Sequence, residues 1–128
     1  MRNADGWDFK RWDFKKKGNS MLGNPKLRDV QLDSSEFKQV MDFMEGQGFW
    51  SIDNDILNLK SKPDEDGRAL MIEVLDGYTY EFQRITHGSH IFITANNPAR
   101  LQEFVYSQQR QVFLDCHSKF YKYLTGID

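Results

Sequence analysis

The chain has 128 residues, which is the size of one domain with a single hydrophobic core. Aromatic residues make up 14% of it, so Phe, Tyr and Trp supply much of that core. The formal net charge of −2 at pH 7 argues against a general nucleic-acid-binding protein, which would be basic. The single cysteine, Cys116, excludes an internal disulfide and fits a reducing compartment. We therefore expect a cytoplasmic location, or a periplasmic one if a signal segment has been removed.

A doubled motif marks the N-terminus, where the letters WDFK occur at 7–10 and again at 12–15. The five-residue offset moves the aromatic positions to the opposite face of a strand, and about 140° around a helix, so neither element places them all on one side. We expect residues 1–26 to be an aromatic and basic arm with a linker over 16–26, either irregular or a bulged edge strand over the core. Because residues 1–17 hold six Lys or Arg against three acids, stacking on single-stranded nucleic acid is the alternative use of this arm.

Helical spacing begins near residue 34, within the single α+β domain expected over 27–128. Ser34 is suited to be an N-cap, and apolar residues follow at i, i+3, i+4 and i+7, so a helix is predicted from about Ser35 to Glu45, closed by Gly46. The next segments are predicted to be a short extended piece with Phe49, Trp50 and Ile52, a strand over 56–60 with Leu57 and Leu59 inward, and a polar turn over 61–67.

The stretch 68–95 is predicted to form three antiparallel strands, because Asp76-Gly77 and His87-Gly88 are hairpin signals between runs of β-branched, aromatic and aliphatic residues. A two-residue first loop would mix apolar and polar residues on both faces, and a loop shifted by one residue would set Glu73 opposite Glu81. A three-residue loop that ends at Gly77, with this glycine in the left-handed region, avoids both problems. The predicted pairs are then Val74 with Tyr78, Ile72 with Tyr80, Leu70 with Phe82, Thr86 with Ser89, Arg84 with Ile91, and Phe82 with Ile93.

This register gives the sheet one apolar face and one mixed face. The inner face consists of Leu70, Ile72, Val74, Tyr78, Tyr80, Phe82, Ile91 and Ile93. The outer face consists of Met71, Glu73, Glu81, Gln83, Ile85, His90 and Phe92. The outer face is more apolar than a solvated face requires, which is a first indication of a binding surface.

Asn97 and Pro98 are predicted to open a long C-terminal helix as its cap and first turn, and Gly126 to end it. Such a helix would span roughly 40 Å, so a break is expected near 115–117. Its inward stripe is predicted to contain Leu101, Val105, Gln108, Val112, Cys116, Phe120 and either Tyr123 or Leu124. The predicted fold is α+β: a helix, an antiparallel meander of four or five strands and the long helix, with the helices on one face of the sheet.

Residue types of common active sites do not gather at useful spacings. His87 belongs to a turn and His90 to the outer face, and no acid or cysteine completes a metal-ligand set with them. Cys116 and His117 lie about 100° apart on a helix, which prevents a nucleophile–base pair and predicts a buried thiol beside an exposed imidazole. No catalytic residue, metal or cofactor is therefore expected.

Acidic residues gather in the loops around the strand expected at 56–60. The stretch 53–58 lacks the glycine and the final glutamate of an EF-hand loop, so calcium is not expected. Solvated turns are one interpretation, and a negative patch for a basic partner is the other. These acids are Asp53, Asp55, Asp64, Glu65 and Asp66.

Three features resemble a widespread group of small, mostly uncharacterised bacterial α+β proteins. They are Phe49-Trp50-Ser51-Ile52 before a strand, an Asp-Gly turn with an aromatic strand at 75–81, and a C-terminal helix opened by proline. The similarity covers residues 34–124, departs from the group in the doubled WDFK arm and the longer last helix, and brings no catalytic residues. At the level of fold, small acidic domains of this kind are also similar to immunity proteins that neutralise secreted bacterial toxins.

The sequence therefore favours a non-catalytic protein-binding module, most concretely an immunity-type inhibitor of a bacterial toxin. A small hydrolase or ligand-binding domain that uses His90 with Glu81 or Glu73 is the alternative, followed by a nucleic-acid accessory protein that uses the N-terminal arm. A membrane partner is not expected, because no apolar run has transmembrane length. The predicted partner-binding residues are Met71, Glu73, Glu81, Ile85, His90 and Phe92 on the outer face, and Asp53, Asp55, Asp64, Glu65 and Asp66 at one edge.

Overall fold

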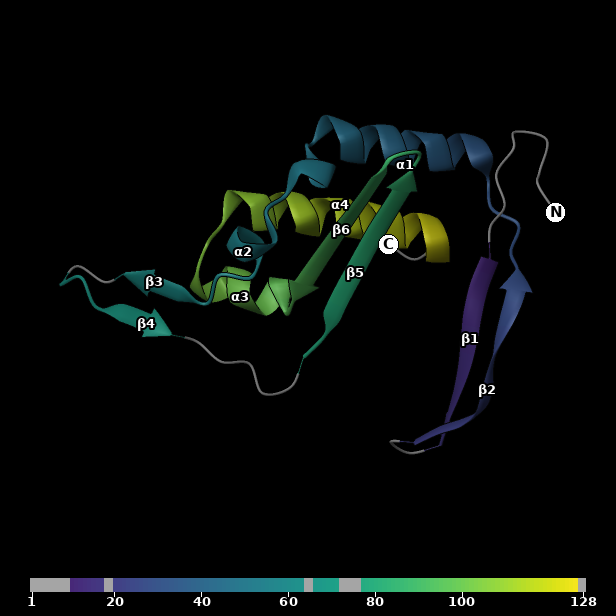
Figure 1. Ribbon diagram of the computed structural model, residues 1–128, viewed down its shortest axis with the longest axis horizontal. Coiled ribbons are helices and arrows are strands. Elements are labelled where there is room, and N and C mark those ends of the chain that lie inside the picture. Colours follow the sequence, from purple (N-terminus) through teal and green to yellow (C-terminus); the bar gives the residue numbers. More distant parts are fainter. Residues whose placement is uncertain (1–9, 18–19, 64–65, 72–76, 127–128) are drawn as a thin grey trace. The chain divides into compact units, whose positions relative to one another are not determined.

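The computed structural model describes residues 10–17, 20–63, 66–71 and 77–126 (Figure 1). Contacts within the chain divide it into two compact units, Met1–Gln39 and Val40–Asp128. The described part contains helices and two-stranded antiparallel sheets, so the fold class is α+β.

The first unit contains a two-stranded ribbon, in which β1 (Lys10–Lys17) pairs antiparallel with β2 (Ser20–Asp29). The register shifts between Asp13 and Lys15, because three residues of β2 lie opposite one residue of β1. Pro25, which has no N–H to donate, falls in this bulge. The prediction of a linker over 16–26 was therefore wrong wherever the structure describes this stretch, since it lies in the two strands.

The first helix, α1 (Ser34–Gly46), forms as predicted and begins one residue earlier. Asp33 rather than Ser34 caps it. The Asp33 Oδ1 accepts hydrogen bonds from the Ser35 hydroxyl at 2.6 Å and from the Glu36 N–H at 2.9 Å. These bonds lower the pKa of Asp33, the Ser35 bond most, because they favour the ionised carboxylate.

The segment after α1 is helical, where the sequence predicted extended structure. Phe49–Ser51 forms a 3-10 turn, η1, and Asn54–Leu57 forms the single-turn helix α2. Asp53 caps α2, because its Oδ1 accepts hydrogen bonds from two N–H groups of the first turn at 2.8 and 3.4 Å. This local cap overrides the strand-like alternation that was the basis of the prediction. Leu57 is buried as predicted, whereas Leu59 is exposed.

The predicted meander is not formed by the described residues. β3 (Ser61–Pro63) and β4 (Ala69–Met71) make a small ribbon of their own, in which Leu70 pairs with Lys62. The pairing of Leu70 with Phe82 was therefore wrong. Gly67, at φ 79°, turns the chain between the two arms, so the stretch predicted as a polar turn contributes one strand of a hairpin. Ile72 and Val74, the other predicted partners, lie outside the described residues.

The hairpin predicted around His87-Gly88 is confirmed, with β5 (Thr79–Thr86) antiparallel to β6 (Ser89–Asn96). Gly77, in contrast, does not have the predicted left-handed backbone. A Cβ atom at Gly77 would lie 1.5 Å from the Asn97 Oδ1, so a close approach of this side chain requires the glycine instead. The confirmed pairs are Thr86 with Ser89, Arg84 with Ile91, and Phe82 with Ile93.

The predicted C-terminal helix consists of two helices, α3 (Pro98–Phe104) and α4 (Gln108–Thr125). The break lies at 105–107, and not near 115–117 as predicted. Ser107 begins the second helix, because its hydroxyl accepts a hydrogen bond from the Arg110 N–H at 3.3 Å.

The break changes which residues of α4 face inward. Arg110 and Phe113 are fully buried, whereas Gln108, which the continuous helix placed on the inward stripe, is exposed. Cys116 is buried as predicted, and Gly126, at φ 69°, ends the helix as predicted.

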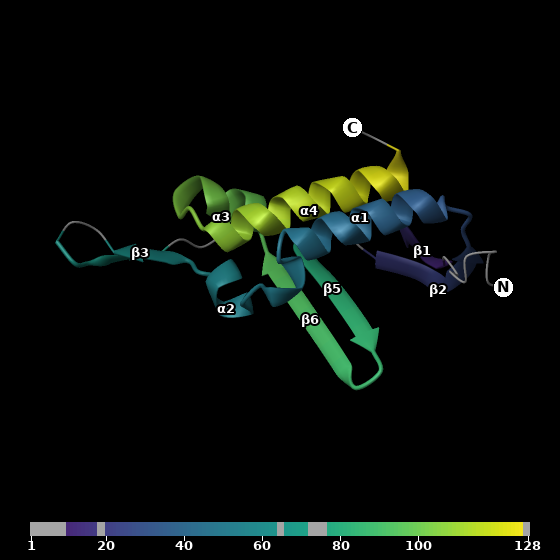
Figure 2. The same ribbon diagram turned by 90° about the horizontal axis from the view of Figure 1, so that it is seen from above.

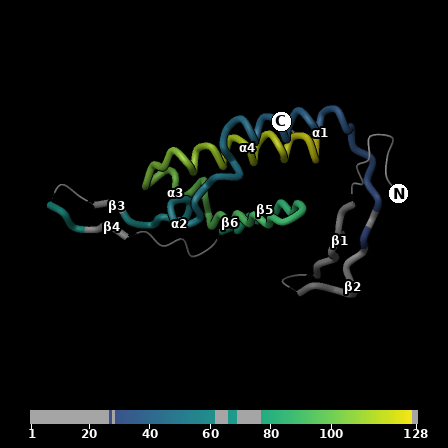
Figure 3. Tube along the Cα trace, turned by 45° about the horizontal axis from the view of Figure 1, so that its top comes forward, coloured from purple at the N-terminus to yellow at the C-terminus, as the bar shows by residue number. Residues whose placement is uncertain are grey.

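The core of the second unit contains residues of α1, η1, α2, β6 and α4, with inner-face residues of β5 packed against it. The second half of α1 lies beside α4 (Figures 2 and 3), where the Lys119 Nζ lies 4.7 Å from the centre of the Phe43 ring. The Phe82 ring of β5 packs edge-to-face against two other rings, with centre-to-centre distances of 5.1 Å to Phe49 and 5.7 Å to Phe113. The buried residues of this core are Val40, Met44, Phe49, Leu57, Ile93, Ala95, Phe113 and Cys116.

Candidate functional site

Main-chain hydrogen bonding divides the residues of β5 into two sets. The Asn97 N–H donates to the Tyr78 carbonyl oxygen at 2.7 Å, so Tyr78 and every second residue after it are hydrogen-bonded to β6. The residues between them point their main-chain N–H and C=O groups away from β6, toward the outer edge of β5. These residues are Thr79, Glu81, Gln83 and Ile85 on β5, and their counterparts on β6 are Asn96, Thr94, Phe92 and His90.

Two asparagine side chains close the outer edge of β6. Asn54 accepts a hydrogen bond from the Thr94 N–H at 3.1 Å and donates to the Phe92 carbonyl at 2.9 Å. Asn58 accepts from the Asn96 N–H at 2.7 Å and donates to the Thr94 carbonyl at 2.7 Å. Four residues of helix rise roughly 6 Å and two residues of strand roughly 6.7 Å, so the two amides match successive outward positions of β6. Each amide replaces a peptide group of a neighbouring strand.

A buried arginine fixes the end of α2. Arg110 is 0% exposed, and its guanidinium donates to the carbonyls of Leu57 at 3.0 Å and Leu59 at 2.8 Å. It also donates to the Val105 carbonyl and, at 3.4 Å, to the Gln102 Oε1. Burial lowers the pKa of Arg110, because the charged form loses hydration. Among the described residues no carboxylate pairs with it, so carbonyl oxygens near the ends of α2 and α3 compensate the charge.

The outer edge of β5 has no such cover in the described part of the chain. There, β5 pairs with β6 alone, and the main-chain groups of Glu81 and Gln83 that point away from β6 have no hydrogen-bond partner. Unpaired strand edges of this kind are where further strands add.

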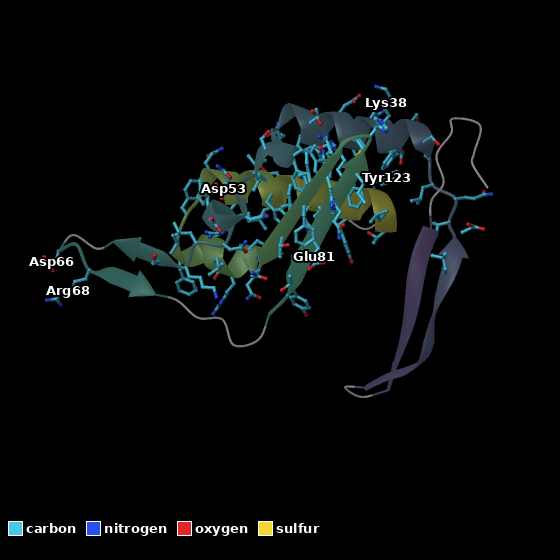
Figure 4. All side chains as sticks on the ribbon, in the orientation of Figure 1. Lys38, Asp53, Asp66, Arg68, Glu81 and Tyr123 are labelled. Atoms are coloured by element: carbon cyan, nitrogen blue, oxygen red, sulfur yellow. The ribbon has the colours of Figure 1, made fainter. Side chains whose placement is uncertain are left out.

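A groove of about 370 Å³ lies beside this open edge, between β5 and the second half of α4. Its walls are mainly aromatic and apolar, and Glu81, labelled on β5 in Figure 4, belongs to its rim. A second hollow of about 240 Å³, around Asn97 and Pro98, shares Tyr80 with it. The groove is lined by Tyr80, Glu81, Phe82, Gln83, His117, Phe120, Tyr121 and Leu124.

His117 forms part of the groove wall, where the sequence predicted an exposed imidazole. Its ring centre lies 4.3 Å from that of Tyr80 and 6.1 Å from that of Tyr121. Burial lowers the pKa of His117, because the imidazolium form loses hydration. Burial, together with the charge of Asp115, raises the pKa of Cys116 to about 11, so the thiol stays protonated at neutral pH.

The outer face of the hairpin carries exposed apolar side chains, as predicted. Ile85 is 74% exposed and Phe92 is 42% exposed. Glu81 and His90 are exposed on the same face. The His90 Nε2 lies 3.0 Å from the Gln83 Oε1, so this imidazole contacts Gln83 rather than a carboxylate.

The remaining predicted partner-binding residues do not join this face within the described residues. Asp53 is the cap of α2 and Asp55 lies in its first turn, so both belong to the helix that closes β6. Asp66 is exposed in the turn between β3 and β4 (Figure 4). Met71 ends β4, where it pairs with Ser61. Asp64, Glu65 and Glu73 lie outside the described residues.

Sequence reasoning missed the residues that make the two edges different. Asn54 and Asn58 have a helical i, i+4 spacing, but this signal was hidden because Asn58 falls in the strand predicted over 56–60 and Asn54 in the loop before it. Arg110 has no signal in the sequence, since a charged side chain is expected to be exposed. His117 and Tyr121, also one helical turn apart, could have been recognised as an aromatic stripe of α4.

Within the described residues, no helix is long and apolar enough to cross a membrane, and no group of three or more His, Cys, Asp or Glu could hold a metal ion. Comparison with models of protein families, with curated proteins and with solved structures finds no match to this chain.

Proposed function

We propose that this chain is a non-catalytic protein-binding module, most concretely an immunity-type inhibitor of a bacterial toxin. The observation that supports it best is the exposed outer face of the β5–β6 hairpin. Ile85 and Phe92 stay accessible there although the other face of the same hairpin is covered by the core. Apolar groups that remain exposed beside polar ones are typical of a surface that a partner covers.

The layout of this face fits an interface with an apolar centre and a polar rim. His90 is opposite Ile85 and Gln83 is opposite Phe92, so the two apolar residues are diagonal neighbours within reach of one another. Glu81 follows toward the start of β5. A partner would desolvate Ile85 and Phe92, while the polar residues stay at the margin.

The charge of the second unit supports the choice of an anion-handling toxin as partner. Residues 40–128 hold eight Lys or Arg against thirteen Asp or Glu. A toxin that acts on nucleic acid has a basic site, and complementary fields speed encounter with an acidic inhibitor. The sequence resemblance to immunity proteins points to the same class.

Purification of the tagged chain from its native host, followed by mass spectrometry, tests the proposal by identifying the partner. With the partner in hand, Phe92→Ala should mainly speed dissociation, and Glu81→Lys should slow association and reduce its salt dependence. Ile56→Ala is the matched control, because Ile56 is also 42% exposed but lies on α2. If both variants bind the partner as the parent does, the outer face is not the interface.

A second candidate function, binding of nucleic acid, is favoured by the charge of the ribbon in the first unit. Residues 10–29 hold seven Lys or Arg against two Asp, and the register sets Arg11 opposite Arg28. The positive charge that the sequence concentrates in these two strands would attract the phosphates of a polyanion. Its test is binding of a labelled single-stranded oligonucleotide, which should weaken steeply with salt and weaken further in the Arg11→Gln, Arg28→Gln double variant. Lys60→Gln, Lys122→Gln removes the same charge outside the ribbon, and loss of binding in this control would contradict a role for the ribbon.

A further inference from the structure

The open edge of β5 and the groove beside it form one continuous surface. Glu81 and Gln83 belong to both, because their main-chain N–H and C=O groups point to the open edge and both residues line the groove. A molecule that enters the groove can therefore contact two kinds of group. It can form hydrogen bonds with main-chain N–H and C=O groups at two-residue spacing, and it can pack against the aromatic side chains of the groove wall.

The β6 edge shows what chemistry satisfies such an edge. There, each of two side-chain amides donates to one main-chain carbonyl of β6 and accepts from one main-chain N–H of β6, as a peptide group of a neighbouring strand does. The spacing of Asn54 and Asn58 reproduces the two-residue repeat of a strand. A ligand for the β5 edge must offer the same alternation of donor and acceptor, and an extended polypeptide backbone does so by construction.

The groove adds a requirement on side chains. In an added strand, every second side chain points to the inner side of the hairpin, where Tyr80, Phe82 and Tyr121 form the walls. A charged or strongly polar side chain would lose hydration there without a partner, whereas an aliphatic or aromatic one would fill the apolar space. The side chains between them would point to the outer face, where Ile85 and Phe92 are exposed.

The geometry points to recognition of an extended peptide segment of the partner, which adds as a strand to β5 and places alternate apolar side chains in the groove between β5 and α4. This inference rests on the proposed protein-binding function and specifies its mode. Main-chain hydrogen bonds along Glu81 and Gln83 provide affinity, and the groove selects the apolar side chains. A strand can add to the hairpin at the β5 edge and not at the β6 edge, because the Asn54 and Asn58 side chains already pair with the main chain of β6.

The test uses a proline that removes one edge donor and leaves the hairpin ladder intact. Gln83→Pro deletes an N–H that points away from β6, and proline is tolerated at such edge positions. Gln83→Ala is the matched control, since it removes the same side chain and its contact with His90 but keeps the N–H. Leu124→Lys is a second, independent variant, which introduces a charge into the groove wall without touching β5.

The probe is a phage-displayed library of random peptides selected against the full chain. We expect selected peptides with apolar residues at alternate positions. Their affinity should be about tenfold or more lower for Gln83→Pro than for Gln83→Ala, which lacks the same side chain, and lower by a similar factor for Leu124→Lys than for the parent. Peptides that bind Gln83→Pro as well as the parent, or a selection that yields none, would overturn the inference. If circular dichroism shows that Gln83→Pro does not fold, the affinity of the selected peptides for Leu124→Lys tests the inference by itself.

Two further outcomes separate this inference from the proposed function. A native partner lost in Phe92→Ala but retained in Gln83→Pro and Leu124→Lys would overturn strand addition and leave the protein-binding function in place. A concentration-dependent dimer that Gln83→Pro abolishes would assign the edge to a second copy of this chain, and would likewise overturn the partner peptide.

Discussion

The two edges of the β5–β6 hairpin offer the same main-chain groups, but the rest of the chain treats them differently. At the β6 edge, Asn54 and Asn58 pair with every outward group from the Phe92 carbonyl to the Asn96 N–H. At the β5 edge, the described residues leave Glu81 and Gln83 unpaired above an apolar groove. The single helical turn α2 therefore prevents another strand from pairing with the β6 edge. The β5 edge remains accessible to a binding partner.

The largest effect is expected where the closed edge is anchored. Arg110→Met should lower the free energy of unfolding by about 3 kcal/mol or more, because the carbonyls of Leu57, Leu59 and Val105 would lose their donors. Urea denaturation measures this. Arg100→Met is the control, since Arg100 forms an exposed ion pair with Glu103 and should change the value by less than about 0.5 kcal/mol. Equal effects of the two variants would contradict an anchoring role for Arg110.

The next largest loss of stability is expected when an asparagine amide that takes the place of a peptide group is changed. Asn58→Asp preserves shape and keeps an acceptor for the Asn96 N–H, but sets a carboxylate oxygen against the Thr94 carbonyl. We expect a loss of about 2 kcal/mol in urea denaturation, because a donor is replaced by a repelling charge. Asp55→Asn is the reverse exchange at an exposed position of the same helix, and should be close to neutral. A neutral Asn58→Asp would mean that the amide donor does not stabilise the β6 edge.

A smaller loss is expected at the start of β5. The Asn97 Oδ1 accepts a hydrogen bond from the Tyr78 N–H at 2.7 Å, and a side chain at position 77 would displace it. Gly77→Val should therefore lower the free energy of unfolding by about 1–3 kcal/mol. Gly46→Ala is the control, because nothing lies within 4 Å of a Cβ atom there. A difference in thermal stability between the two variants supports the close approach, and equal stabilities would contradict it.

The smallest effect concerns acid stability of the groove wall. The folded state holds the pKa of His117 below its ordinary value of 6.5, so the unfolded chain binds more protons as the pH falls through that value. The contribution of His117 to stability is thus present above this pH and is lost below it. His117→Phe should flatten the fall of the melting temperature on acidification, and His90→Gln, at an exposed histidine, should not. An equally steep fall of the melting temperature on acidification in the parent and in both variants would contradict a buried His117.

The sequence predicted those parts of the fold that depend on local signals. The β5–β6 register followed from a Gly-containing turn and alternating apolar residues, and it correctly placed Glu81, Ile85, His90 and Phe92 on one exposed face. The first helix and Gly126 as the end of the last one also followed from local patterns.

The errors arose where two local signals competed or where tertiary partners decide. Residues 56–60 alternate like a strand, but the Asp53 cap begins a helix at Asn54, and the predicted strand hid the helical spacing of the two asparagines. A cap at Ser107 restarted the last helix and brought Arg110 and Phe113 inward. The burial of Arg110 depends on carbonyls 51 to 53 residues earlier in the chain, which no local pattern reveals.

Backbone hydrogen exchange, measured by NMR for each amide, tests the difference between the two edges most directly. We expect slow exchange for the N–H groups of Thr94 and Asn96, which bond to asparagine side chains, and fast exchange for those of Glu81 and Gln83. The Phe82 N–H, within the β5–β6 ladder, should be slow and serves as the internal reference. Slow exchange at Glu81 and Gln83, or exchange at Thr94 and Asn96 as fast as theirs, would contradict a hairpin with one closed and one open edge.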